Sequence, residues 1–263
     1  MNDFFNEMQE SSYFMEVDGV DEKTSHSLRK RLRKHLLNSG VSIDGGALQP
    51  DLFSYVENVY EAFSSSKVLK ELLKDHDVIF CRHADAHLNK GTGWHKDRPE
   101  DRFFNEDYNI YKIGIYLQDH TLKKYKDRAL SILSGSHKYK ELFSESCNVK
   151  VINPKAQDIL FFDLRATHKG EELSKVEKVM NKFGVLSWLD YIYGRGLRKK
   201  EEKLAVFFSV CIFKKGDKKF KFLKDHMAEV SERQNKQNKS EGSDSVLEKN
   251  IKGLKEIGFK FYE

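Results

Sequence analysis

Two histidines and an aspartate are the residues of this sequence whose types and spacing most clearly suggest chemistry. His95 and Asp97 stand one residue apart in Trp94-His95-Lys96-Asp97, and His168 follows far downstream. Side chains alternate along a strand with period two, so His95 and Asp97 project from the same side of an extended segment. Two imidazoles and one carboxylate are the ligands of non-heme iron(II) oxygenases, which leave one face of the metal open. The pattern predicts an iron enzyme if the three residues meet.

His95 and Asp97 alone are weak evidence for a metal site, because a surface pair of this kind arises by chance. The prediction therefore also depends on the elements that would position the three ligands. Short apolar segments bounded by Gly, Asn, Asp and Pro predict strands at 78–82, 111–117, 129–133, 149–152, 158–162 and 204–213. Such spacing is typical of a sandwich or double-sheet barrel rather than a parallel sheet. Apolar residues at helical spacing predict helical stretches at 21–39 and 51–74 before the first strand.

Five pieces of this chain, in this order, resemble the phytanoyl-CoA dioxygenase-like family of iron(II)/2-oxoglutarate oxygenases. They are Trp94-His95-Lys96-Asp97, the strand at 112–119, Leu133-Ser134-Gly135-Ser136-His137, the segment 158–168 and the strand that starts at Lys203. Together they cover roughly residues 78–213. The resemblance implies a mainly β fold with flanking helices around a double-stranded β-helix, which is a jelly-roll, cupin-like core.

The resemblance also implies the roles of the three candidate ligands. His95, Asp97 and His168 would bind iron(II) and form the catalytic centre, with 2-oxoglutarate and dioxygen as co-substrates. The expected reaction hydroxylates a small or medium-sized metabolite and releases succinate and carbon dioxide. Two alternatives stay open: a jelly-roll binding or scaffold protein without turnover, and a cupin-type metal enzyme that does not use 2-oxoglutarate.

The distal carboxylate of 2-oxoglutarate needs a buried cation, and arginine suits it because its fork binds in bidentate fashion. At the position that matches the family's arginine, this sequence has Lys203, which supplies the charge with less directional binding. The competing candidates for binding this co-substrate are Lys112, Arg198, Arg195 and Arg82. Lys169-Gly170 also lacks the small hydroxyl residue that the family places after the distal histidine. These departures motivate the scaffold alternative.

Other reactive side chains are interpreted as structural. The resemblance places His137 at a turn after a core strand rather than at the metal. Cys81, Cys147 and Cys211 form no CxxC pair, and this odd count without a secretory leader indicates reduced thiols in a cytoplasmic protein. No apolar run approaches the roughly 20 residues needed to cross a bilayer. We therefore expect a soluble, cytoplasmic protein.

Composition along the chain predicts an oxygenase domain at 1–222, comprising N-terminal helices and the jelly-roll core, and a charged helical extension at 223–263 with a flexible linker. A lid-like insertion is expected at about 171–202. Its aromatic and basic residues suit an anionic substrate, while a solvated structural insertion is the alternative. These residues are Trp188, Tyr191, Tyr193, Arg195, Arg198, Lys199 and Lys200.

The charge balance narrows the class of partner. The net charge of +5 arises from 46 basic and 41 acidic residues, which is a mild imbalance. It fits an anionic small molecule, and the basic residues follow no recognisable nucleic-acid-binding motif. We expect a small-molecule substrate and no nucleic-acid partner. The sequence does not predict the oligomeric state.

Overall fold

The computed structural model describes residues 2–38, 47–88, 92–104, 108–123, 125, 129–170, 203–217, 223–229, 232 and 242–261. The helices are α1 (Asn2–Ser11), α2 (Glu22–Asn38), α3 (Glu61–Ser64), α4 (Lys67–Asp75) and α8 (Asp244–Ile257), with 3-10 turns η1 (Leu52–Ser54), η2 (Asp101–Phe103) and η3 (Ser136–Lys138). The strands are β1 (Tyr13–Glu16), β2 (Ala47–Gln49), β3 (His76–Leu88), β4 (Ile110–Tyr116), β5 (Leu130–Ser134), β6 (Asn148–Ile152), β7 (Ile159–Asp163), β8 (His168–Gly170), β9 (Leu204–Lys214) and β10 (Lys260–Phe261). The predicted insertion at 171–202 lies outside the described residues.

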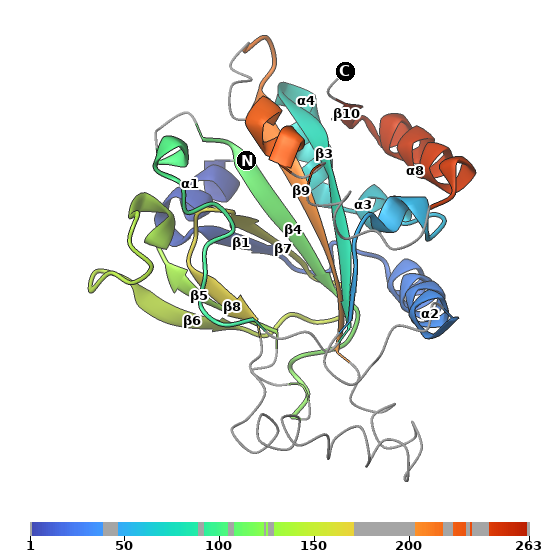
Figure 1. The fold of residues 1–263 in the computed structure, drawn as a ribbon, viewed down its shortest axis with the longest axis horizontal. Helices are drawn as coiled ribbons and strands as arrows, with labels where there is room; N and C mark the ends of the chain where they lie inside the picture. Colours follow the sequence, from blue (N-terminus) through green and yellow to red (C-terminus); the bar gives the residue numbers. More distant parts are fainter. Residues whose placement is uncertain are drawn as a thin grey trace.

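Two sheets face each other and form the core (Figure 1). The larger sheet has the strand order β1-β7-β4-β9-β3-β10, with β2 paired to β3, and the smaller sheet has the order β6-β5-β8. All described strand pairs are antiparallel except β10 with β3. The predicted mainly β, jelly-roll architecture with flanking helices is therefore confirmed.

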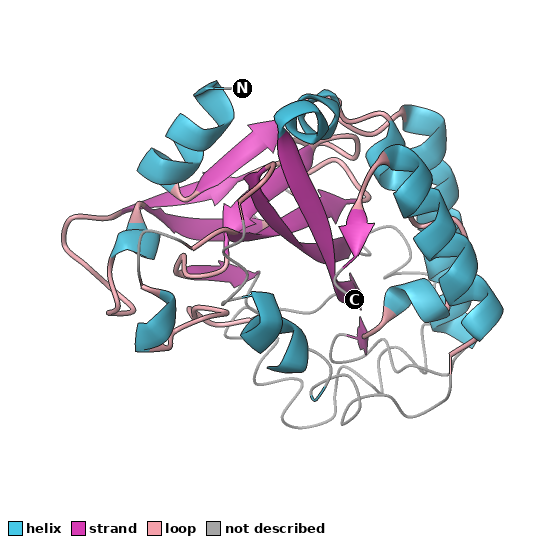
Figure 2. Ribbon diagram, turned by 90° about the horizontal axis from the view of Figure 1, so that it is seen from above, coloured by secondary structure: helices cyan, strands magenta, loops and turns pink. Residues whose placement is uncertain are grey.

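Period-two alternation gives the larger sheet two different faces. Ile113, Phe161 and Phe208 belong to the apolar cluster that the sheet shares with α1, α2, α4 and α8. Phe162 and Phe207, which point the opposite way, pack with residues of β5 in the smaller sheet. The helices lie outside the strands (Figure 2), so the inner face is left to the second sheet and to a cavity. None of the described helices combines the length and apolar character needed to span a bilayer.

The sequence predictions hold well for the strands and for α2 but fail for the helical stretch at 51–74. The structure divides this stretch into η1, α3 and α4. Asp51 and Asn58 have φ angles of 51° and 58°, a left-handed conformation that interrupts a helix. Ser66 then starts α4 as a separate helix, because its Oγ accepts a hydrogen bond from the Leu69 N–H at 3.0 Å.

Two sets of contacts made by the terminal segments were not specified by the sequence predictions. β1 pairs antiparallel with β7, with Tyr13 opposite Phe162, and so extends the larger sheet. At the other end, Asn250 of α8 binds the main chain after η1: its Oδ1 accepts from the Val59 N–H at 2.8 Å, and its Nδ2 donates to the Val56 carbonyl at 2.8 Å. The terminal segment 244–261 therefore packs on the core, while the domain boundary at residue 222 stays a prediction.

His137 lies in η3, the turn that the resemblance predicted, and it makes the protein's stability depend on pH. Its side chain is 6% exposed, and its Nδ1 lies 2.7 Å from Ser12 Oγ. Burial lowers the pKa of His137 to about 4, whereas an unfolded histidine has a pKa of about 6.5. The neutral ring is favoured in the folded state, so stability is lost as pH falls from about 6.5 to about 4, by at most about 3 kcal/mol.

Urea unfolding of the wild type and of His137→Gln at pH 7 and pH 4.5 measures this contribution. We expect the wild type to lose more unfolding free energy than the variant over this interval. Equal losses would show that His137 does not titrate as its burial requires.

Candidate metal centre

A backbone bridge brings the two candidate histidines together. The His95 N–H donates to the His168 carbonyl and the His168 N–H donates to the His95 carbonyl, both at 2.9 Å. The two residues form an isolated antiparallel bridge at the edge of the smaller sheet, because His168 starts β8. Residues that face each other across such a bridge project to the same side. The imidazole centroids consequently lie 4.4 Å apart.

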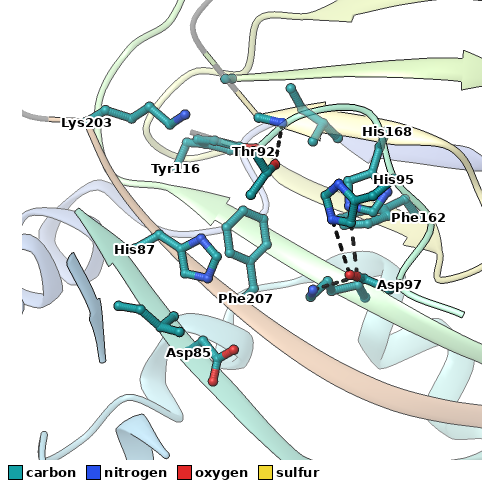
Figure 3. Close-up of a pocket in the computed structure, with 15 residues that line it drawn as sticks. Asp85, His87, Thr92, His95, Asp97, Tyr116, Phe162, His168, Lys203 and Phe207 are labelled. Carbon is teal, nitrogen blue, oxygen red and sulfur yellow. Dashed lines mark hydrogen bonds and ion pairs between the residues drawn. The ribbon is translucent and has the colours of Figure 1, made fainter. Parts of the chain in front are cut away.

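Asp97 completes a group of three potential ligands, whose atoms all lie within 4.8 Å of one another (Figure 3). Asp97 Oδ1 is 3.5 Å from His95 Nε2, and Asp97 Oδ2 is 3.9 Å from His168 Nε2. Two atoms that each lie about 2.1 Å from one ion are at most about 4.2 Å apart. Both carboxylate–imidazole separations are below this limit, so the residues fit a shared metal ion.

The outer nitrogens of both rings are hydrogen-bonded in the way a metal site requires. His95 Nδ1 lies 2.8 Å from the Gly93 carbonyl, and His168 Nδ1 lies 2.9 Å from the Ala166 carbonyl. A carbonyl oxygen only accepts, so each Nδ1 carries the proton and donates it. Each Nε2 therefore faces Asp97, and it is the nitrogen through which an ion held by Asp97 would be bound.

The ionisation states also suit metal binding. Burial lowers the pKa of His168 to about 4, which keeps this ring neutral at pH 7. Hydrogen bonding to Asp97 raises the pKa of His95. Burial acts to raise the pKa of Asp97, but the charge of Lys112 and the hydrogen bond from His95 hold it well below its usual value. Metal ligands must be deprotonated, and the ionised Asp97 and neutral His168 satisfy this condition, whereas His95 has to release the proton that it shares with Asp97 before its Nε2 binds an ion.

Lys112 stands at the metal end of the site. It lies on β4 opposite Phe162 of β7 and Ser209 of β9, on the inner face of the larger sheet. Its Nζ donates to Asp97 Oδ2 at 2.7 Å and lies 5.6 Å from the centroid of the Phe207 ring. Lys112 and Lys203 are the predicted co-substrate residues whose side chains the structure describes, and of these two Lys112 contacts a candidate metal ligand.

A cavity of about 190 Å³ opens beside the three ligands. One water occupies roughly 30 Å³ of liquid, so the cavity has room for a small organic molecule as well as an ion. Lys203 lies on its wall immediately before β9 and is 3% exposed. Figure 3 shows Lys203 on the opposite side of Tyr116 and Thr92 from the histidines. A buried cation on the wall distant from the metal end matches what the sequence predicts for a carboxylate anchor.

Some lining residues were missing from the sequence predictions. Thr92 Oγ1 accepts a hydrogen bond from the Gly170 N–H at 2.9 Å, so a hydroxyl lies beside the residues that follow His168 although the sequence has none there. No local signal points to Thr92, because the contact joins distant segments. Asp85 and His87 also line the cavity. Their alternation with alanines in Ala84-Asp85-Ala86-His87 is a sequence pattern that could have predicted that both side chains share one face of the strand. Arg198 and Arg195 lie outside the described residues.

No family model matches the sequence, and no curated protein matches it. Solved structures do match. The non-heme alpha-ketoglutarate-dependent carbocyclase SnoK from nogalamycin biosynthesis is 12% identical, with a TM-score of 0.54 over 86% of this chain and 90% of SnoK. HygX from Streptomyces hygroscopicus, solved with nickel and 2-oxoglutarate bound, is 12% identical, with a TM-score of 0.56 over 80% of this chain and 87% of HygX.

The chain has the fold of non-heme 2-oxoglutarate-dependent enzymes. EctD from S. alaskensis, solved with 2-oxoglutarate and 5-hydroxyectoine, adds a third example at 11% identity and a TM-score of 0.52, over 78% of this chain and 74% of EctD. The likeness of fold covers 78–86% of this chain, whereas the resemblance seen in the sequence covers residues 78–213.

Proposed function

We propose that this protein is an iron(II)- and 2-oxoglutarate-dependent dioxygenase that hydroxylates a small or medium-sized molecule. The observation that carries the proposal is the meeting of His95, Asp97 and His168 at one end of a cavity inside a jelly-roll core. The structures of HygX with nickel and 2-oxoglutarate and of EctD with 2-oxoglutarate support it, because they share this fold.

His95, Asp97 and His168 would hold the iron ion through two Nε2 atoms and one carboxylate. When bound, iron(II) would allow dioxygen, which is the oxidant, to convert 2-oxoglutarate into succinate and carbon dioxide and to place its second oxygen atom into a substrate C–H bond. The task of the chain is to orient the reactants and to exclude water. Tyr116, Phe162 and Phe207 line the cavity with aromatic surface and so limit the access of water.

Lys203 would bind the distal carboxylate of 2-oxoglutarate. It is buried on the cavity wall, whereas Lys112 is held at 2.7 Å from Asp97 at the metal end. A dicarboxylate that reaches from the metal to Lys203 would use both ends of the cavity. Thr92 offers a hydroxyl that still has a proton to donate, because its oxygen accepts from the Gly170 N–H.

The reaction outcome and the partners remain part of the proposal. Structures with this fold include the carbocyclase SnoK and the epimerase SnoN, so hydroxylation is one of several reactions open to such a site. The expected anionic character of the substrate rests on Arg195 to Lys200, which lie outside the described residues. The absence of a nucleic-acid partner and the cytoplasmic location stay predictions from the sequence.

The decisive assay measures succinate formed from 2-oxoglutarate in air with added ferrous iron, with each component omitted in turn. We expect turnover only when both iron and 2-oxoglutarate are present. A cupin-type enzyme would consume oxygen with its substrate in the absence of 2-oxoglutarate. A scaffold protein would convert neither 2-oxoglutarate nor oxygen. Failure of the metal-loaded protein to bind 2-oxoglutarate would contradict the proposal.

Lys112→Met is expected to destabilise the metal-free protein and to increase the stabilisation that metal provides. Without its 2.7 Å partner, the Asp97 carboxylate loses a charged hydrogen bond in a mostly buried place, at a cost of about 1–3 kcal/mol. A bound cation compensates the same carboxylate. Thermal unfolding with and without nickel should therefore show a nickel-induced rise in Tm that is about 4 °C larger in the variant than in the wild type.

Lys150→Met is the control for this measurement, since Lys150 is exposed on β6. It should respond to nickel as the wild type does. Equal nickel-induced shifts in Lys112→Met and in the wild type would show that Lys112 and the metal do not share Asp97.

A further inference from the structure

Lys96 stands between the candidate ligands His95 and Asp97 in the chain, but its side chain points away from them. His95 and Asp97 line the cavity, whereas Lys96 does not, as alternation along an extended segment requires. The Lys96 side chain is buried, and its Nζ donates to the carbonyls of Ser136 and Arg165, both at 2.8 Å. Lys96 therefore joins the segment that carries two of the ligands to two other parts of the chain.

Both carbonyls belong to the region that positions the third ligand. Arg165 lies three residues before His168, in the connection between β7 and β8. Ser136 lies in η3, and its Oγ accepts a hydrogen bond from the N–H of Thr167, the residue before His168, at 2.8 Å. Lys96 consequently contacts the support of His168 at two points.

The bond from Lys96 to Arg165 lies between two places where the main chain already joins the same segments. At one end, the histidine bridge joins residues 95 and 168 through two hydrogen bonds of 2.9 Å. At the other end, the Arg98 N–H donates to the Leu164 carbonyl at 3.0 Å. The Lys96 side chain adds a link within this stretch, beside the carboxylate ligand.

A lysine costs more in this place than an apolar side chain of similar length would. Burial lowers the pKa of Lys96 to about 8, because it disfavours the charged amine. A buried amine is tolerated when its protons reach acceptors, and here the acceptors are main-chain carbonyls. Each bond therefore fixes the position of a main-chain segment relative to Lys96.

We propose that Lys96 is a positioning residue for the metal centre, which holds the segment of His95 and Asp97 at the distance from His168 that one ion requires. The inference rests on the proposed function, because it concerns the same three ligands. Asp97 Oδ2 and His168 Nε2 are 3.9 Å apart, close to the limit of about 4.2 Å for two ligands of one ion. A small displacement of either segment would exceed this limit.

Lys96→Met tests the proposal, because methionine keeps most of the length of the side chain and removes both hydrogen bonds. We expect the dissociation constant of nickel(II), measured by calorimetry, to rise by about 10- to 100-fold, as is typical when the support of a metal ligand is lost. The visible absorption bands of bound cobalt(II), which depend on ligand geometry, should shift as well. A nickel dissociation constant equal to that of the wild type would overturn the proposal.

Asn250→Leu is the matched control, because it also removes two hydrogen bonds to main-chain carbonyls. Asn250 Nδ2 donates to the carbonyls of Phe53 at 3.0 Å and Val56 at 2.8 Å. Its helix, α8, packs on the face of the larger sheet that is turned away from the cavity. The control should lower Tm and leave nickel affinity and the cobalt spectrum as in the wild type. Equal losses of nickel affinity in both variants would show general destabilisation and would overturn the proposal.

Two further measurements decide the matter if Lys96→Met does not fold. Ser136→Ala keeps the carbonyl that accepts from Lys96 but removes the Oγ that accepts from the Thr167 N–H. We expect it to weaken nickel binding about tenfold, and unchanged binding would contradict the proposal. A crystal structure of the nickel-loaded wild type needs no variant. Lys96 Nζ bonded to both carbonyls supports the proposal, and an Nζ that contacts neither contradicts it.

Binding of nickel and of 2-oxoglutarate to the wild type is measured first and separates the two proposals. If the wild type binds both and Lys96→Met binds nickel equally well, the positioning role fails and the proposed function stands. If the wild type binds nickel but no 2-oxoglutarate, the proposed function fails, and the nickel titrations still decide the role of Lys96. A wild type that binds no nickel contradicts both.

Discussion

Asp97→Ala is expected to abolish iron-dependent formation of succinate and to weaken metal binding by more than about 100-fold. Loss of a residue that merely supports a ligand typically costs 10- to 100-fold in metal affinity, and Asp97 is the one anionic member of the candidate ligand group. Without it, two imidazoles remain in the candidate ligand group and neither carries a charge that offsets the ion. Calorimetric titration with manganese or nickel and a succinate assay measure the two effects.

His137→Gln is the matched control for the ligand substitutions. His137 is a buried histidine as His168 is, but it lies in η3 and contacts Ser12 rather than the cavity. The control should therefore keep metal affinity and turnover, while His95→Ala and His168→Ala behave as Asp97→Ala does. Tight metal binding by Asp97→Ala would exclude this group as the metal centre.

Lys203→Met should raise the dissociation constant of 2-oxoglutarate by about 10- to 100-fold and leave metal affinity unchanged. A hydrogen bond to a charged group contributes roughly 1.5–3 kcal/mol, which corresponds to this range. Lys203 is buried on the cavity wall, so its ammonium group would meet the carboxylate with little screening by water. Titration of 2-oxoglutarate into nickel-loaded protein measures the change, and Lys203→Arg should retain most of the affinity.

Lys214→Met is the control, because Lys214 is exposed at the opposite end of the same strand, β9. It should bind 2-oxoglutarate as the wild type does. If Lys203→Met binds normally and Lys112→Met does not, the anchor lies at the metal end and the assignment to Lys203 is wrong. If neither substitution matters, the carboxylate is held by a residue outside the described part of the chain.

The two lysines also show where prediction from sequence stops. Both were candidates by charge and by position in the chain, and the sequence does not rank them by distance. In the structure, Lys112 contacts Asp97 and Lys203 lies across the cavity. That distinction depends on the pairing of β4 with β9, which places Lys112 opposite Ser209 and Tyr116 opposite Ala205.

The sequence predictions rested on side-chain chemistry and on short-range periodicity, and those for α2 and for the strands are confirmed. His95, Asp97 and His168 could be proposed as ligands from their types, and α2 from the spacing of Leu28 and Leu32. Apolar runs predicted β4, β5, β7 and β9, because burial on both faces of a strand leaves a local pattern; β6 was predicted from Val149 and Val151 although both are exposed. These signals depend on residues within a few positions of one another, so they can be recognised in the amino-acid sequence without knowledge of the tertiary structure.

Contacts between segments that are distant in the sequence determined the features of the site that the sequence did not predict. The mutual backbone bonds of His95 and His168, the hydroxyl of Thr92 beside Gly170, and the placing of Asp85 opposite Phe207 each join residues far apart in the chain. Strand register is set by the packing of whole faces, and no short segment encodes its partner. The chain's composition and motifs thus indicate a metal and a fold, while folding decides which polar groups meet around the cavity beside His95, Asp97 and His168.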